Sequence, residues 1–227
     1  IEGGQNMTQE DMRIIKKSWL FRTMKDEEMR QAAEELCGHK KTFSRGQILI
    51  HEGDVQEFVG ILLSGEVRIS RITMDGTENL FQKLSSPYLL GADIVCTPSR
   101  VSPYTAYCSD EAQVWFFDYR KIRTPGVVRE EIRLSLQERF LQFIANENIR
   151  NFYKIDMLSS RNAREKILKY LRIQKRRQKD GVIEISYDRE ELASYLCMNR
   201  SVLSHTLSEM RREGILDFRK NRFILKA

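Results

Sequence analysis

The segment DREELASYLCMNRSVLSHTLSEMRREGIL, residues 188–216, decides how the C-terminal part of the chain folds. It predicts two short helices joined by a tight link. Asp188 can cap the first helix, with Glu191 in the capping-box position, and Asn199 can cap the second. One face of the second helix carries an apolar stripe typical of a packed helix, formed by Leu203, Leu207 and Met210.

The opposite face of the second helix is short and polar. It consists of Arg200, Ser201, Ser204, His205 and Ser208. A packed rear and a polar front are typical of a helix that reads the DNA major groove. The fork of Arg200 can donate to guanine, and the serines and His205 can pair with several bases.

The residues around this helix pair favour the same function. Arg189, on the first helix, can contact a phosphate. Two short strands follow the pair, and the turn between them, residues 219–222, predicts a basic wing that includes Lys220. The alternative is an ordinary helical hairpin with solvated charges, which would not require a strand before the pair and a basic hairpin after it.

The distribution of charge supports a polyanionic partner for this part of the chain. The whole chain has 38 Lys and Arg against 32 Asp and Glu, a net charge of +6. Residues 157–227 carry 17 basic and 9 acidic side chains, a net charge of +8, whereas residues 1–156 carry 21 and 23, a net charge of −2. We therefore expect the C-terminal part to bind double-stranded DNA.

The sequence before residue 126 follows a different pattern. After two short helical segments, apolar runs such as FVGILL and QVWFFDY alternate with turns that contain glycine, which predicts a β-roll or barrel. The dipeptide Asp75–Gly76 predicts a hairpin. The fold class is therefore α+β: an N-terminal jelly-roll-like β-roll domain (7–125), a long dimerisation helix and hinge (126–158), and a C-terminal winged helix-turn-helix domain (159–227).

The long helix has an unusually wide apolar arc. Its apolar residues at helical spacing are Ile132, Leu136, Phe140, Phe143 and Ile144, continued less regularly by Ile149, Phe152 and Tyr153. One β-roll needs about one such stripe, so the remaining surface predicts a homodimer. The alternative is a helix that packs only on its own domain.

Composition narrows the remaining classes of function. The chain contains 41% hydrophobic and 31% charged residues. It has no apolar run near the ~20 residues of a membrane span and nothing like a signal peptide. We therefore expect a cytoplasmic protein with no membrane partner. The four cysteines and three histidines are dispersed, which predicts no metal and no cofactor. A metal-dependent enzyme on a cupin-like barrel would need a set of ligands that His39 and His51 cannot supply. We expect no catalytic residues.

The order of the predicted elements resembles that of the Crp/Fnr family, which includes the cyclic-AMP receptor protein and the fumarate–nitrate regulator. That order is two short helices, a β-roll, a long helix and a winged helix-turn-helix. The resemblance covers residues 7–227, and its carriers are FSRGQILIHEGD, LLSGEVRIS, DGTENLFQKL and the helix-pair segment quoted above. It implies a homodimeric transcription regulator in which an effector at the β-roll and long helix alters the placement of the DNA-reading helices. RNA polymerase is a further candidate partner.

The chain departs from the cyclic-nucleotide-binding members of this family at the effector loop. In those members a Glu after a Gly accepts from the ribose, and an Arg before Ser/Thr–Ala neutralises the cyclic phosphate. Here Ala92 follows Gly91, and Tyr104 precedes Thr105 and Ala106. The resemblance therefore implies an effector other than cyclic AMP.

The expected effector pocket consists of Phe81, Tyr88, Gly91, Ala92, Arg100, Tyr104 and Thr105. Its neutral and aromatic side chains suit a small, partly apolar molecule, or no ligand at all if they fill the pocket themselves. Arg100 is a second source of positive charge and could replace the missing Arg.

Two further departures concern other branches of the family. Its iron–sulfur members carry a cysteine cluster near the N-terminus, which this chain lacks. The family's reading-helix pattern Arg–Glu–x–x–x–Arg corresponds to Arg200, Ser201 and His205, so a different operator is expected. A cyclic-nucleotide sensor that acts through protein binding is the alternative function, against which the basic reading helix argues.

Overall fold

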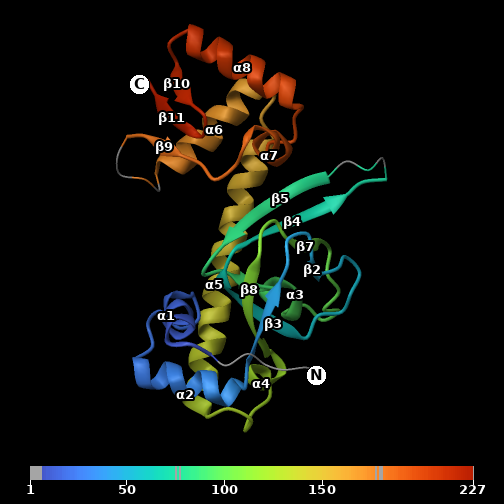
Figure 1. The fold of residues 1–227 in the computed structure, drawn as a ribbon, viewed down its shortest axis with the longest axis vertical. Helices are drawn as coiled ribbons and strands as arrows, with labels where there is room; N and C mark the ends of the chain where they lie inside the picture. The colour runs from blue at the N-terminus through green and yellow to red at the C-terminus, as the bar shows by residue number, and fades with distance from the viewer. Residues whose placement is uncertain (1–6, 75, 77, 177, 179–180, 227) are drawn as a thin grey trace. The chain divides into compact units, whose positions relative to one another are not determined.

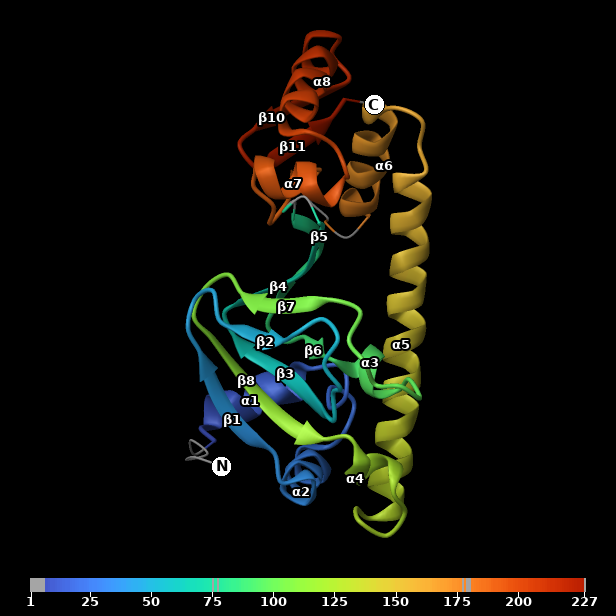
Figure 2. The ribbon, with the colours of Figure 1, turned by 90° about the vertical axis from the view of Figure 1, so that its right-hand side faces the viewer.

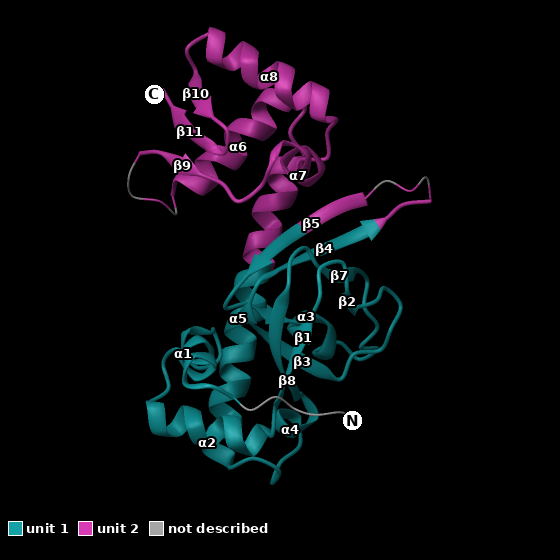
Figure 3. Ribbon diagram, viewed as in Figure 1, with its two compact units in different colours: residues 1–71, 82–147 teal, residues 72–81, 148–227 magenta. Residues whose placement is uncertain are grey.

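The computed structural model describes residues 7–226 except 75, 77, 177, 179 and 180. The chain forms two compact units (Figure 3). The N-terminal unit contains the residues up to Arg71 together with 82–147, and the C-terminal unit contains 72–81 together with the residues from Asn148 onward. The predicted boundaries at 125/126 and 158/159 stay our proposal for how the chain is organised.

The N-terminal unit is the predicted β-roll with helices. In chain order its elements are α1 (Gln9–Lys17), α2 (Asp26–Leu36), β1 (His39–Phe43), β2 (Ile48–Ile50), β3 (Phe58–Ser64), β4 (Glu66–Ile72), β5 (Glu78–Ser85), β6 (Leu89–Leu90), α3 (Ala92–Val95), β7 (Thr105–Cys108), β8 (Ala112–Asp118) and α4 (Arg120–Arg123). The end of β4 at residue 72 and the first half of β5, residues 78–81, are assigned to the C-terminal unit. The strands form two four-stranded sheets, with orders β1-β8-β3-β6 and β2-β7-β4-β5 (Figures 1 and 2). The prediction of a roll is confirmed.

The turns of the roll depend on glycine where the sequence indicated. Gly65, between β3 and β4, has a φ of 82°, and a Cβ there would lie 2.1 Å from the carbonyl oxygen of Glu111. Only a residue without a side chain fits that position. β4 and β5 are neighbours in their sheet, as the predicted hairpin requires, and Gly76 has a φ of 81°. Asp75 of the predicted turn lies outside the described residues.

The segment between β6 and β7 contains a short helix that its sequence does not announce. Pro98 and Pro103 are typical of an irregular loop, whereas residues Ala92–Val95, just before them, form the helix α3. Gly91, at its N-cap, has a left-handed φ of 73°. This turn buries Ala92, Ile94 and Val95 in the roll. Four residues are too few for a helical period to show in a sequence.

The long helix α5 (Glu130–Leu158) carries two separate apolar stripes. The stripe that the sequence singled out, Ile132, Leu136, Phe140 and Phe143, is buried in the core of its own unit. A second set, Leu134, Leu141, Phe152 and Ile155, is 53%, 71%, 65% and 64% exposed. Of this set only Phe152 was predicted from the sequence.

The C-terminal unit is a winged helix-turn-helix, as predicted. Its elements are α6 (Ala163–Lys175), β9 (Ile183–Glu184), α7 (Arg189–Tyr195), α8 (Arg200–Arg212), β10 (Leu216–Arg219) and β11 (Arg222–Leu225). The strands form a sheet of order β10-β11-β9. Asp188 and Glu191 make the predicted capping box at α7, and β10 pairs with β11 from Leu216–Leu225 to Arg219–Arg222.

A buried ion pair joins α1 to the roll. The Nζ of Lys40 on β1 lies 2.8 Å from Oδ2 of Asp11, and the two side chains are 7% and 6% exposed. The backbone N–H of Thr8 donates to the same carboxylate at 2.8 Å. Burial alone would raise the pKa of Asp11, but the hydrogen bonds from Lys40 and Thr8 lower it below its ordinary value.

Removing one partner of this pair should destabilise the N-terminal unit strongly. Lys40→Met leaves the Asp11 carboxylate buried without a counter-charge, which costs about 3–5 kcal/mol of unfolding free energy. The double variant Lys40→Met/Asp11→Leu removes both charges and should recover most of that loss. Urea titrations of the three proteins measure it. Equal losses in the single and double variants would show that the charge pair does not govern this contact.

Candidate nucleic-acid interface and effector loop

Helix α8 presents the predicted reading face to solvent. Leu203, Leu207 and Met210 are completely buried against the core of the C-terminal unit. The opposite face is exposed and holds Arg200, Ser201, Ser204, His205 and Ser208. Asn199 occupies the N-cap position, but its side chain makes no capping hydrogen bond. The helix therefore offers short polar groups and one guanidinium at its N-terminal end.

Some of these groups already have partners on the helix itself. The Oγ of Ser208 donates to the carbonyl of Ser204 at 2.9 Å, and Nε2 of His205 lies 3.5 Å from Oε1 of Glu209. His205 is nevertheless 76% exposed. The guanidinium of Arg200 makes no hydrogen bond or ion pair with any residue that the structure describes. The guanidinium of Arg200 is thus available to a base.

Arg189 has a structural task in addition to its predicted phosphate contact. Its guanidinium carbon lies 4.9 Å from the ring centre of Phe218 and 5.1 Å from that of Phe223. It also donates to the carbonyl of Lys220 at 3.1 Å. Burial lowers the pKa of Arg189 from its ordinary value. Arg189 therefore braces the wing against α7, and its role toward phosphate stays a prediction.

The wing turn carries the basic side chains that the sequence placed there. Arg219, Lys220 and Arg222 are all exposed, and Lys220 has a left-handed φ of 52°. The turn joins β10 to β11 directly, so these side chains project from a short, paired hairpin. Such a hairpin suits contacts with the DNA backbone.

In the predicted effector loop, Tyr104 stands at the position that the resemblance assigns to a phosphate-binding Arg. The side chain is buried, and its hydroxyl lies 2.9 Å and 3.1 Å from the two carboxylate oxygens of Asp93 on α3. Burial, followed by the charge of Asp93, raises the pKa of this phenol far above its ordinary value. Tyr104 is therefore a neutral donor whose partner is a carboxylate.

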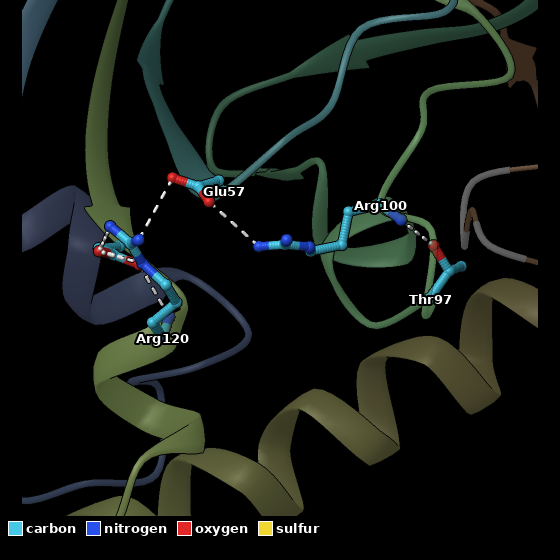
Figure 4. Close-up of polar contacts among 5 residues, drawn as sticks. Glu57, Thr97, Arg100 and Arg120 are labelled. Carbon is cyan, nitrogen blue, oxygen red and sulfur yellow. Dashed lines mark hydrogen bonds and ion pairs between the residues drawn. The ribbon is translucent and has the colours of Figure 1, made fainter.

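The side chain of Arg100 is paired with a carboxylate (Figure 4). Its guanidinium lies 3.2 Å from Oε1 of Glu57, whose other oxygen lies 3.5 Å from Arg120. Its backbone N–H donates to Oγ1 of Thr97 at 3.0 Å, and its carbonyl accepts from the N–H of Gln56 at 2.8 Å.

The remaining residues of the expected pocket are also engaged. Ala92 is completely buried. The hydroxyl of Tyr88 accepts from Gln82 at 3.1 Å, and Oγ1 of Thr105 accepts from the N–H of Glu52 at 3.3 Å. Six of the seven expected residues belong to the N-terminal unit, but Phe81 belongs to the C-terminal unit. Sequence reasoning missed Asp93 and Glu57, which no local motif marks.

The cysteines and histidines form no ligand set in the described part of the chain. Among those residues no group of three or more His, Cys, Asp or Glu side chains could hold a metal ion. All four cysteines are free, and only Cys108 is buried. No helix among the described residues is long and apolar enough to cross a membrane.

Comparison with known families finds two matches, one on each side of helix α5. The cyclic nucleotide-binding domain family matches residues 40–124, and the Crp-like helix-turn-helix domain family matches residues 165–227. Transcriptional activator protein FnrL of Cereibacter sphaeroides is 24% identical over 209 residues, which are 86% of this chain and 79% of FnrL.

Two solved structures are similar in fold. FixK2 from Bradyrhizobium japonicum has a TM-score of 0.65 at 16% identity, covering 84% of this chain and 93% of FixK2. The c-di-GMP-responsive regulator CLP from Xanthomonas campestris has a TM-score of 0.68 at 14% identity, covering 86% of this chain and 98% of CLP.

The order of domains and the reading surface define a DNA-binding transcription regulator, not an enzyme. The two family matches, in this order along the chain, identify the family of regulators. The chain belongs to the Crp/Fnr family of transcription regulators.

Substitutions in the reading helix and in the wing should change DNA binding in different ways. Arg200→Ala should relax base preference at one position per half-site, a loss of about 1–3 kcal/mol of discrimination, because the fork that pairs with guanine is gone. Lys220→Ala should weaken binding to all sequences alike and flatten its salt dependence. Fluorescence anisotropy with a panel of operators at several salt concentrations separates the two. The same unselective loss in both variants would contradict this division of roles.

Proposed function

We propose that this chain acts as a homodimer that binds specific DNA sequences and that its effector, if it has one, is not cyclic AMP or another cyclic nucleotide. The observation that carries the DNA-binding part is α8, whose apolar rear is completely buried while its polar front is exposed. A two-fold dimer would present two such helices to half-sites about one helical turn of DNA apart. Such a regulator acts in the cytoplasm, where the DNA is, with RNA polymerase as a further partner.

The exposed stripe of α5 supports the homodimer. Leu134, Leu141, Phe152 and Ile155 are separated by 7, 11 and 3 residues, which keeps them on one face of the helix. Ala145 and Asn148 fall on the same face and are also exposed. This spacing is that of a coiled-coil seam, and a second copy of α5 would cover it.

A charge in this seam should separate the dimer. We expect Leu141→Asp to sediment as a monomer at micromolar concentration and to lose most of its DNA affinity, because each half-site alone binds weakly. The matched control is Asn146→Asp, which adds the same charge to an exposed position outside the seam of the same helix. A wild-type monomer with intact DNA binding, or a dimeric Leu141→Asp, would overturn the dimer proposal.

The charges in the proposed effector loop disfavour the binding of a cyclic nucleotide. An anion that enters a partly closed site needs an opposite charge, since its burial otherwise costs several kcal/mol. The loop offers Tyr104, which is neutral and already donates to Asp93, and Arg100, which is paired with Glu57. Ala92 has no group that could accept from a ribose. The basic reading surface also favours DNA over the alternative of a sensor that acts through protein binding.

Calorimetry with cyclic AMP and cyclic GMP tests this proposal. We expect no saturable binding to the wild-type protein at millimolar ligand. The variant Ala92→Glu/Asp93→Ala/Tyr104→Arg should bind measurably, since it restores both family contacts and removes the carboxylate that would neutralise the new Arg. Saturable binding by the wild type that disappears in Arg100→Ala would show that the positive charge had moved to Arg100.

A further inference from the structure

The C-terminal unit includes a short piece of β-hairpin, residues 72–81, in addition to the helix-turn-helix (Figure 3). β5 is the edge strand of its sheet, in the order β2-β7-β4-β5. One side of an edge strand has backbone N–H and C=O groups without a neighbouring strand. At residues 78–80 these groups have a different partner.

That partner is the hydroxyl of Ser194 near the end of α7. Its Oγ donates to the carbonyl of Glu78 and accepts from the N–H of Leu80, both at 3.0 Å. The two backbone groups are those that a further strand would pair with. A single hydroxyl that both donates and accepts satisfies both of them.

The side chains around this contact strengthen it. Leu80 is 5% exposed and belongs to the apolar core that also contains Leu192 of α7 and Leu203 of α8. The Nζ of Lys154 on α5 donates to the carbonyl of Phe81 at 2.6 Å and lies 4.0 Å from the ring centre of Tyr195. Burial lowers the pKa of Lys154 to about 8.

We propose that Ser194 and Lys154 are positioning residues for DNA binding, which clasp residues 78–81 to α7 and so hold the helix that precedes the reading helix. The clasp leaves the reading face exposed, so the clasped form is the one competent to bind DNA. Release of the hairpin lets α7 leave its place for part of the time. The apparent affinity for DNA then falls with the fraction of protein that is competent.

The test uses the full chain with Ser194→Ala and Lys154→Met. Ser194→Ala removes both hydrogen bonds and should speed amide exchange at Leu80. We expect DNA affinity to fall roughly fivefold to tenfold, equally for preferred and non-preferred sequences, which corresponds to the loss of one or two net hydrogen bonds. Ser159→Ala is the control, since among the described residues its hydroxyl donates only to the carbonyl of Ile155, in the last turn of α5. Ser194→Thr keeps the hydroxyl and should restore both readouts.

Each outcome decides the proposal. Faster exchange at Leu80 together with unselective loss of DNA affinity, rescued by Ser194→Thr, supports it. Faster exchange with unchanged or higher DNA affinity overturns it, because the contact would then be structural or inhibitory. Unchanged exchange at Leu80 also overturns it. If Ser194→Ala does not fold, Lys154→Met gives the same decision, because it breaks the contact to Phe81 and leaves Ser194 in place.

Discussion

What the C-terminal unit presents to DNA depends on the complete burial of three side chains of α8. Side chains three or four positions apart share a helix face, so burying Leu203, Leu207 and Met210 forces the polar residues between them outward. The same core holds Leu192 of α7 and Leu216 of β10, so the helix before and the wing after rest on one apolar cluster. A net positive charge attracts a polyanion but does not determine which surface it contacts. The packing of α8 determines which face of the helix is exposed to DNA.

Helix α5 carries two apolar stripes, of which its own chain buries one. Its first stripe is consumed by the core of the N-terminal unit, where Phe140 lies 6.4 Å from Phe117 and 5.1 Å from Tyr119 between ring centres. Its second stripe is exposed and suits a second copy. The sequence indicated only that the apolar arc was too wide for one partner. Leu134 and Leu141 could not be assigned to either partner until the backbone fixed which face met the roll.

The parts that sequence predicted are those with a local signal. The helix pair, the capping box at Asp188 and the glycine turns of the roll depend on residues a few positions apart, and they were predicted correctly. The missed parts depend on distant pairs. Arg100 meets Glu57 across 43 positions of the sequence and Leu80 meets Ser194 across 114, and no periodicity announces such partners. The short helix α3 was missed for a different reason, since it lasts barely one turn.

The segment from Gly91 to Thr105, the proposed effector loop, lies within the range matched by the cyclic nucleotide-binding domain family. Gly91 is required by its left-handed φ, and the completely buried Ala92 contributes to the core, so this part of the frame is kept by folding rather than by a ligand. The charged positions have no such constraint. With Asp93 beneath Tyr104, a cyclic phosphate would meet a carboxylate where the family offers a cation. Restoring Arg at position 104 alone would only pair it with Asp93, leaving no net positive charge. On our proposal, the absence of cyclic-nucleotide binding therefore depends on at least two positions, 93 and 104, that act together.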